Sequence, residues 1–311
     1  MAAFFHFPLA FRCWDAFART ALFVYGCLEF GTAAPEYLVP DAVQEEYEVI
    51  PWNQAKADQA LWRALADGWP KVFLFDYDGT LAPFVPDPSK AVPYPGVAEA
   101  VERIIVAGGR VFFVTGRRCE EVPGLLGLHR PVEVFGSHGG ERLHPDGTKR
   151  GLTLKPDQET GFEQAAAWAT GAGFAAVLER KPGCMSFHLR SMPEEQRAEA
   201  RDAAVAAWGP LSRASGLSLR DFDGGVELRV AGIHKGRAVH TVLREAGAGA
   251  TVFYLGDDYT DEDAFEALGA RGVSVLVRSQ ARPSSAKWWL RPPQELLEFL
   301  GLAASLCERD I

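Results

Sequence analysis

The chain has 311 residues, of which 48% are hydrophobic and 23% are charged, a composition typical of a soluble globular protein with a sizeable core. The formal net charge of −9 argues against a domain-wide basic surface for nucleic acid or anionic lipid. The apolar runs are all shorter than the ~18 residues of a membrane span. The five cysteines are scattered without a CxxC pair, which indicates free thiols in a reducing, cytoplasmic compartment.

Residues 1–65 are predicted to form an N-terminal extension of unknown role. Their opening stretch is rich in aromatic residues but is interrupted by Arg12, Asp15 and Arg19. A secretory signal carries its basic residues ahead of the apolar run, whereas here they fall within it. A segment docked on the protein is therefore favoured over a targeting segment, and an interfacial amphipathic helix is a third alternative.

From about residue 70 the sequence alternates between short apolar strands and helices. The segment 95–109 has apolar residues at helical spacing, a proline at its start and two glycines at its end. The expected strands are 71–75, 110–116, 131–140, 251–258 and 272–278, and the expected helices are 95–109, 234–247 and 260–270. This order predicts right-handed βαβ units and therefore a Rossmann-like parallel-sheet core of the α/β class.

The middle of the chain has a different pattern. Segments 175–191 and 217–232 are typical of strands, the second broken by a hairpin turn at 223–225. The segment 193–209 between them has the Ala/Val face of a helix. We therefore predict an α+β cap domain over residues 142–225, inserted into a hydrolase core formed by residues 66–141 and 226–311.

Polar residues follow the predicted core strands, at the sheet edge where open parallel sheets bind ligands. Asp76 and Asp78 follow the first strand, Thr115 the second, and Asp257 and Asp258 the run that begins at 251, while Lys235 opens the helix just ahead of that run. Four carboxylates near one point repel each other unless a cation lies among them, and hard oxygen ligands suit Mg²⁺. A carboxylate-bound metal beside a lysine and a hydroxyl is suited to phosphoryl transfer. Of two carboxylates two residues apart, one can attack while the other handles protons.

The order of these motifs carries a family resemblance. "DYDGT", the turn at 115–117, Lys235 and "GDDYTDED" resemble the four motifs of the haloacid dehalogenase superfamily. Within it, "FDYDGTLAPF", "GSHGGE", "RKPGCMSFHLR", "VELRVAGIHKG" and "YLGDDYTDEDAF" are similar to trehalose-6-phosphate phosphatases. The resemblance spans residues 72 to about 300. A lone DxD is weak evidence, whereas the ordered combination is specific.

The resemblance implies catalytic roles at four matching positions. Asp76 would be the nucleophile that forms an aspartyl-phosphate, and Asp78 would be the general acid for the leaving sugar and then the base for water. Thr115 and Lys235 would hold the phosphoryl oxygens.

The resemblance also implies a metal site for Mg²⁺. Asp76, the backbone carbonyl of Asp78, and Asp257 would bind the ion, with Asp261 as a nearby supporting carboxylate.

A further set of positions is associated in the family with binding the substrate or its immediate support. This set comprises Arg117, His138, Glu141, Lys181, Arg190, Glu227 and Arg229. Other interpretations stay open for most of its members. His138 could pack in its loop, Glu141, Glu227 and Arg229 could form an interdomain salt-bridge set, and Lys181 and Arg190 could lie on solvated strand faces. Asp258 and Glu262 could simply favour the start of a helix.

The chain departs from the family pattern in four places. Thr115 replaces the more usual serine and keeps the hydroxyl, and Gly140 stands where alanine is common. Leu189 stands where an aromatic residue is usual in "HYR", and His234 precedes the lysine where Asn or Asp is frequent. None of these changes removes a catalytic group, but the last two bear on the identity of the sugar.

The sequence predicts a Mg²⁺-dependent sugar-phosphate phosphatase, with trehalose 6-phosphate as the expected substrate. The alternatives are a phosphatase of sucrose phosphate or a glycosyl-phosphoglycerate, a phosphomutase with a bisphosphate activator, and a non-catalytic regulatory module of the same fold. A separate synthase polypeptide is expected to supply the substrate, and no nucleic acid or membrane partner is expected.

Overall fold

The structure is a computed structural model that describes residues 49–308 except Pro86 and Asp223. Most of the predicted N-terminal extension, with Cys13 and Cys27, lies outside the described residues, as does the first residue of the predicted hairpin turn. Among the residues described, Cys119, Cys184 and Cys307 are buried free thiols. No helix in this part of the chain is long and apolar enough to cross a membrane.

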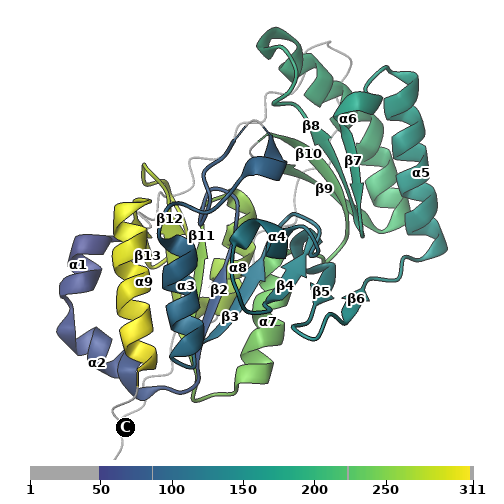
Figure 1. The fold of residues 1–311 in the computed structure, drawn as a ribbon. Helices are drawn as coiled ribbons and strands as arrows, with labels where there is room; N and C mark the ends of the chain where they lie inside the picture. Colours follow the sequence, from purple (N-terminus) through teal and green to yellow (C-terminus); the bar gives the residue numbers. More distant parts are fainter. Residues whose placement is uncertain (1–48, 86, 223, 309–311) are drawn as a thin grey trace, which may run out of the picture. The chain divides into compact units, whose positions relative to one another are not determined.

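The described residues form two separate sheets with helices packed on them (Figure 1). The larger sheet has the order β1 (Ile50–Pro51), β13 (Trp288–Leu290), β12 (Val273–Val277), β11 (Thr251–Gly256), β2 (Lys71–Phe75), β3 (Arg110–Val114), β4 (Glu133–Gly136), β5 (Glu141–Leu143) and β6 (Lys149–Gly151). The smaller sheet has the order β7 (Leu178–Lys181), β8 (Cys184–His188), β10 (Gly225–Val230) and β9 (Leu217–Phe222). The helices are α1 (Trp52–Ala57), α2 (Gln59–Asp67), α3 (Val97–Val106), α4 (Val122–Leu126), α5 (Pro156–Gly171), α6 (Glu194–Ser215), α7 (Lys235–Ala246), α8 (Glu262–Leu268) and α9 (Gln294–Cys307).

The larger sheet is parallel from β1 to β4, and β5 and β6 continue it antiparallel. The smaller sheet is antiparallel throughout. A mostly parallel α/β core with a separate antiparallel insertion confirms the predicted fold class.

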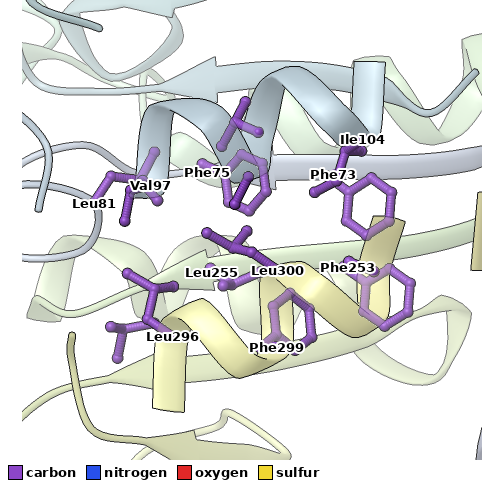
Figure 2. Packing of buried hydrophobic residues seen from close by; sticks show 14 of the residues in the cluster. Phe73, Phe75, Leu81, Val97, Ile104, Phe253, Leu255, Leu296, Phe299 and Leu300 are labelled. Atoms are coloured by element: carbon purple, nitrogen blue, oxygen red, sulfur yellow. The ribbon is translucent and has the colours of Figure 1, made fainter. Parts of the chain in front are cut away.

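The strand β2 is apolar on both faces because helices cover both sides of the sheet. Side chains alternate across a strand, so Phe73 and Phe75 face α3 and α9, whereas Val72 and Leu74 face α7 and α8. Figure 2 shows the first of these layers, in which Phe299 of α9 packs near the strand phenylalanines. Helical spacing therefore places the apolar side of each amphipathic helix against the sheet.

The strand β2 lies at the point where the strand order reverses. It pairs with β3 on one side and with β11 on the other. The chain winds away through β3 and β4 and returns through α7 to β11. A crevice forms at such a reversal, beyond the carboxyl ends of the strands. The topology thus places the loop after β2 at the ligand-binding edge.

The two sheets divide the chain at other residues than the predicted domains. The predicted cap begins at residue 142, but β5 and β6 belong to the larger sheet, which ends at Gly151. The predicted cap ends at residue 225, but β10 pairs with β8 and β9 and so keeps the smaller sheet until Val230. The strand β1 pairs with β13, so the core sheet also includes residues before 66. Backbone pairing decides which sheet each of these strands joins. The residue pattern of a single segment does not show this pairing.

The cap has its own apolar core beneath α5 and α6. Trp208 of α6 packs against Phe187 of β8, with ring centroids 5.8 Å apart. Phe162 of α5 belongs to the same cluster, with small alanines along both helices. The sequence does not predict α5, because the apolar stripe of this helix is narrow. The helix α6 continues past Pro210 to Ser215, whereas the sequence predicts its end at 209.

Candidate active site

The loops after β2 and β11 and the start of α7 bring a buried charged cluster together. Lys235 Nζ lies 2.7 Å from Asp76 Oδ1 and 2.8 Å from Asp261 Oδ1. One carboxylate oxygen each of Asp76, Asp257 and Asp261 lies within 4.8 Å of the others. All four side chains are buried. These residues are far apart in the sequence, and they meet at the carboxyl edge of the sheet, where the positions of the strand ends predict them to lie.

Asp261 differs from the other two carboxylates because each of its oxygens accepts hydrogen bonds from two protein donors. Its Oδ1 accepts hydrogen bonds from Lys235 and, at 2.6 Å, from the Tyr254 hydroxyl. Its Oδ2 accepts from the backbone N–H groups of Asp257, at 3.2 Å, and Asp258, at 3.0 Å. Asp261 therefore fixes Lys235 and the backbone of the loop after β11.

The electrostatics of the cluster reflect burial and an excess of negative charge. Burial raises the pKa of Asp76 to about 7, against the opposing effect of Lys235. Burial also raises the pKa of Asp257 well above its ordinary value, and Asp76 and Asp261 add to this shift. Burial acts to lower the pKa of Lys235, but attraction to Asp261 and Asp76 outweighs it and the pKa is raised. Three carboxylates share one ammonium, so an additional cation would stabilise their charged forms.

The donor set of this cluster fits a small divalent cation. Carboxylate oxygens are hard ligands of the kind that Mg²⁺ prefers. Gly79 in the turn after β2 makes the close approach possible, since its φ is +85° and a Cβ there would lie 2.2 Å from Asp257 Oδ2. Thr80 Oγ1 lies 3.3 Å from both Asp76 Oδ2 and Asp257 Oδ1 and links the two carboxylates.

Asp78 lies apart from the cluster and is held by Arg117. Arg117 Nε and Nη2 each donate to one oxygen of Asp78 at 2.6 Å, which forms a bidentate pair. The guanidinium also donates to Pro88 O at 2.9 Å and lies over the Tyr77 ring. The structure thus places Arg117, predicted as a substrate-binding residue, against the predicted acid–base carboxylate.

Thr115 lies directly after β3, where the sequence predicts it. Its side chain is buried, and its Oγ1 accepts a hydrogen bond from Arg117 N at 3.1 Å. No contact with the carboxylates of the cluster is among its hydrogen bonds in the described chain. Its hydroxyl therefore shapes the turn that carries Arg117.

The loop after β4 is strained, and Glu141 supports it. Ser137 and His138 have φ of 48° and 56°, which is uncommon for residues other than glycine. Glu141 Oε1 accepts from Ser137 Oγ at 3.0 Å and from Cys119 N at 2.9 Å. Lys149 Nζ lies 2.8 Å from the other Glu141 oxygen. The Glu141 carboxylate is thus engaged within the core loops.

His138 reaches from this loop to the cap. Its Nε2 lies 3.4 Å from Glu227 Oε2, and a Cβ on Gly116 would lie 2.8 Å from its ring. Burial and the neighbouring Arg229 lower the pKa of His138 to about 4, although Glu227 opposes this shift. His138 is therefore neutral at pH 7.

Glu227 is the centre of a buried polar network in the cap. It accepts from Arg229 Nε at 2.8 Å, from Ser186 Oγ at 2.9 Å and from Cys184 Sγ at 2.7 Å. Burial acts to raise the pKa of Glu227, but His138 and Arg229 outweigh it and hold the pKa well below its usual range. Glu227 and Arg229 thus pair within the single strand β10, whereas Glu141 belongs to a separate network in the core.

Lys181, at the end of β7, and Arg190, just after β8, both contact the core. Lys181 Nζ donates to Gly116 O at 3.1 Å and lies 3.2 Å from Glu179 Oε2. The Arg190 guanidinium lies 4.6 Å from the centre of the Phe84 ring. Lys181 is largely buried, so the alternative of a solvated strand face does not describe it.

The sequence reading gave no role to several residues that the structure brings to the site. Tyr254 carries a hydroxyl group in the largely apolar strand β11. A polar group in such a strand is a signal in the sequence that its side chain needs a hydrogen-bond partner, here Asp261. Thr80 lies within the first motif, and its position there does not reveal that it contacts both Asp76 and Asp257. Arg278 and Arg282 lie in the β12–β13 loop and donate to the backbone of the loop after β11. Local sequence carries no signal for these two arginines.

Comparison with known proteins agrees with this geometry. The family model described as trehalose-phosphatase matches residues 74–294. The chain belongs to the trehalose-phosphatase family. This confirms the family predicted from the motifs, and the matched residues include the buried cluster, the Asp78–Arg117 pair and the cap.

The chain is also similar to a curated trehalose-phosphatase family member and to solved structures. It is 33% identical over 247 residues to the trehalose-phosphate phosphatase of Mycobacterium marinum, and this match covers 76% of the chain but 62% of that protein. The C-terminal domain of C. albicans trehalose-6-phosphate phosphatase has a TM-score of 0.67 and 22% identity, and the match covers 79% of this chain and 96% of that one. The C-terminal domain of the Candida albicans trehalose synthase regulatory protein has a TM-score of 0.62 and 11% identity, with 83% and 99% covered. Both structural likenesses concern the fold alone.

Proposed function

We propose that the chain is a Mg²⁺-dependent phosphatase that hydrolyses trehalose 6-phosphate to trehalose and phosphate. The observation that carries this proposal is the buried cluster at the strand-order reversal, where Asp76 and Asp257 face each other beside Lys235. Membership of the trehalose-phosphatase family supports the substrate class.

In the first step, Asp76 attacks the phosphorus atom and the bond from phosphorus to the sugar oxygen breaks. Asp78 gives its proton to that oxygen, so that the sugar leaves neutral and an aspartyl-phosphate remains. Lys235, whose Nζ lies 2.7 Å from the Asp76 carboxylate, would stabilise negative charge on the phosphoryl oxygens.

In the second step, water attacks the phosphorus atom of the aspartyl ester. Asp78 accepts a proton from this water, and the bond from phosphorus to the Asp76 oxygen breaks. The carboxylate of Asp76 and inorganic phosphate result. Because Arg117 holds Asp78 in this structure, we expect the pair to loosen when the substrate enters, so that Asp78 can carry a proton.

Asp76, Asp257 and the backbone carbonyl of Asp78 are the groups proposed to hold Mg²⁺. The oxygens of Asp261 already accept four hydrogen bonds, so its part is to orient Lys235 and the backbone of Asp257. A bound Mg²⁺ would neutralise charge on the phosphate oxygens.

The cap is proposed to hold the sugar. Charged and polar side chains gather where the cap meets the core loops, and they belong to Glu227, Arg229, Lys181 and His138. Closure over a sugar would exclude water from the aspartyl ester until the sugar leaves.

The deciding experiment measures phosphate release by the purified full-length protein. The substrates are trehalose 6-phosphate, sucrose phosphate, a glycosyl-phosphoglycerate and p-nitrophenyl phosphate, each with Mg²⁺ and with EDTA. We expect Mg²⁺-dependent release with the highest kcat/KM for trehalose 6-phosphate. A higher kcat/KM for another sugar phosphate would reassign the substrate.

A second candidate function is a non-catalytic regulatory module. The likeness to the trehalose synthase regulatory protein domain favours it at the level of fold. The presence of Asp76, Asp78, Lys235 and Asp257 together supports the enzyme instead, since a module without catalysis has no need of this charged cluster. No release from any substrate, by protein that binds trehalose 6-phosphate, would favour the regulatory module.

The substrate of such a phosphatase is made by transfer of a sugar. We propose that a separate synthase polypeptide supplies it and that hydrolysis takes place in the cytoplasm. Co-purification of the chain with a synthase activity from its own cells would support this partnership.

A further inference from the structure

Two arginines of the loop between β12 and β13 bind the backbone of the loop after β11. Arg282 Nη2 donates to Asp258 O at 2.9 Å and, more weakly, to Asp257 O at 3.4 Å. Arg278 Nη1 donates to Asp257 O at 3.2 Å. Two arginines from a distant loop therefore bind the carbonyl groups of the two residues that follow β11.

Glu262, in the first turn of α8, holds Arg282 in this position. Its Oε1 accepts hydrogen bonds from Arg282 Nη1 and, at 2.9 Å, from Ser284 Oγ. Its Oε2 accepts from Ser285 N at 2.8 Å. The Arg282 side chain is only 9% exposed, and its guanidinium lies 4.5 Å from the centre of the Tyr259 ring. These contacts leave the guanidinium little freedom to turn away.

The peptide groups of Asp257 and Asp258 are thus fixed from both sides. Asp261 accepts their two N–H groups, while Arg278 and Arg282 donate to their two carbonyl groups. The Asp257 side chain lies against Gly79, so a small shift of its backbone would move its carboxylate relative to Asp76. Carboxylate placement within the cluster therefore depends on the β12–β13 loop.

We propose that Arg282, held by Glu262, is a positioning residue that sets the Mg²⁺ affinity of the site through the backbone of Asp257 and Asp258. This inference rests on the metal site of the proposed function. Arg282 does not touch the carboxylates of the cluster, and it acts on the metal through the geometry of its ligand. Partners of metal ligands typically change metal affinity by about 10–100-fold when they are removed.

The test compares Mg²⁺ binding by the full-length protein and three variants. Arg282→Met removes the donors but keeps an apolar stem, and Arg282→Lys keeps the charge without the planar fork. Arg291→Met is the matched control, because Arg291 also pairs with a carboxylate, Glu295, at 2.7 Å and lies over an aromatic ring, Trp289. Mg²⁺ affinity is measured by titration calorimetry below the unfolding temperature, and by the Mg²⁺ concentration that gives half of the maximal rise in Tm.

We expect Arg282→Met to weaken Mg²⁺ binding about 10–100-fold and Arg282→Lys to weaken it less. Arg291→Met should bind Mg²⁺ as the unmodified protein does. At saturating Mg²⁺ the kcat of Arg282→Met should recover to within about threefold, since no group at the reacting atoms is lost.

An unchanged Mg²⁺ affinity in folded Arg282→Met would overturn the proposal. If that variant does not fold, Glu262→Gln gives the same test, because it weakens the hold on Arg282 and keeps the shape of the side chain. An absence of Mg²⁺ binding by the unmodified protein would instead contradict the proposed metal site, and the two failures are therefore distinct.

Discussion

In the core, three buried carboxylates share one lysine, whereas in the cap the buried Glu227 pairs with Arg229 and lies beside the neutral His138. The consequences for the pKa are opposite. The pKa of Asp76 is raised to about 7, mainly by burial, while the pKa of Glu227 lies well below its usual range because its partners outweigh burial. The core cluster keeps an excess of negative charge, whereas the charge of Glu227 in the cap is balanced by Arg229. Chemistry is therefore expected in the core, and recognition and positioning in the cap.

The largest effect should come from the nucleophile. Asp76→Asn keeps the size of the side chain but removes the attacking oxygen charge, so we expect kcat to fall on the order of 10⁴-fold or more. Phosphate release from trehalose 6-phosphate measures this loss, and circular dichroism checks the fold. Asp87→Asn is the matched control, because Asp87 is an exposed carboxylate that, like Asp76, lies between β2 and α3. Near-normal kcat in Asp76→Asn would rule out the covalent route.

The next effect should come from the acid–base carboxylate. Asp78→Asn should lower kcat for trehalose 6-phosphate by about 10²–10⁴-fold, because both protonation of the leaving sugar and activation of water depend on this group. A p-nitrophenolate leaves without a proton, so single-turnover formation of the aspartyl-phosphate from p-nitrophenyl phosphate should be affected less. Equal losses in this step for both substrates would indicate that Asp78 serves only as a neighbour of the metal.

A smaller effect should separate a cap residue from a core residue. Lys181→Met should reduce kcat/KM for trehalose 6-phosphate by about 10–100-fold, because hydrogen bonds to charged groups are worth about 1.5–3 kcal/mol. The same variant should change kcat/KM for p-nitrophenyl phosphate by less than about threefold. Glu141→Gln should lower both values together, since Glu141 supports the strained loop after β4. A sugar-selective loss in Glu141→Gln would move Glu141 to the recognition group.

The smallest effect concerns stability and pH at His138. Its pKa falls from 6.5 to about 4 on folding, so the unfolded chain binds a proton at a higher pH than the folded protein. Stability is therefore fully present above pH 6.5 and declines as the pH falls toward 4. Between pH 6.5 and 5.5 this group should reduce the free energy of unfolding by about 1 kcal/mol. Urea unfolding of the protein and of His138→Asn, which tolerates positive φ, measures the difference. Parallel pH curves for the two would exclude His138 as the source.

The periodic spacing of apolar residues was sufficient to predict the main strands and helices of the core. The apolar strands β2, β3, β11 and β12 and the amphipathic helices α3 and α7 lie where their patterns indicate. The short strands β1, β5 and β6 carry little pattern, because most of their stability comes from pairing with a neighbour. Sheet membership therefore changes at other residues than the predicted domain limits, and the domain division stays a prediction.

The sequence alone determined which chemistry the core could contain. Carboxylates after β2 and β11 and a lysine at the start of α7 must share one edge of a parallel sheet, because the carboxyl ends of its strands point the same way. The tertiary structure decided how each group is used. In the folded protein, Arg117 binds Asp78, Glu141 accepts a hydrogen bond from Ser137 in the loop after β4, and Arg282 donates to the backbone carbonyl of Asp257. These contacts depend on long-range packing and side-chain direction, and neither is encoded in the spacing of residues along the chain.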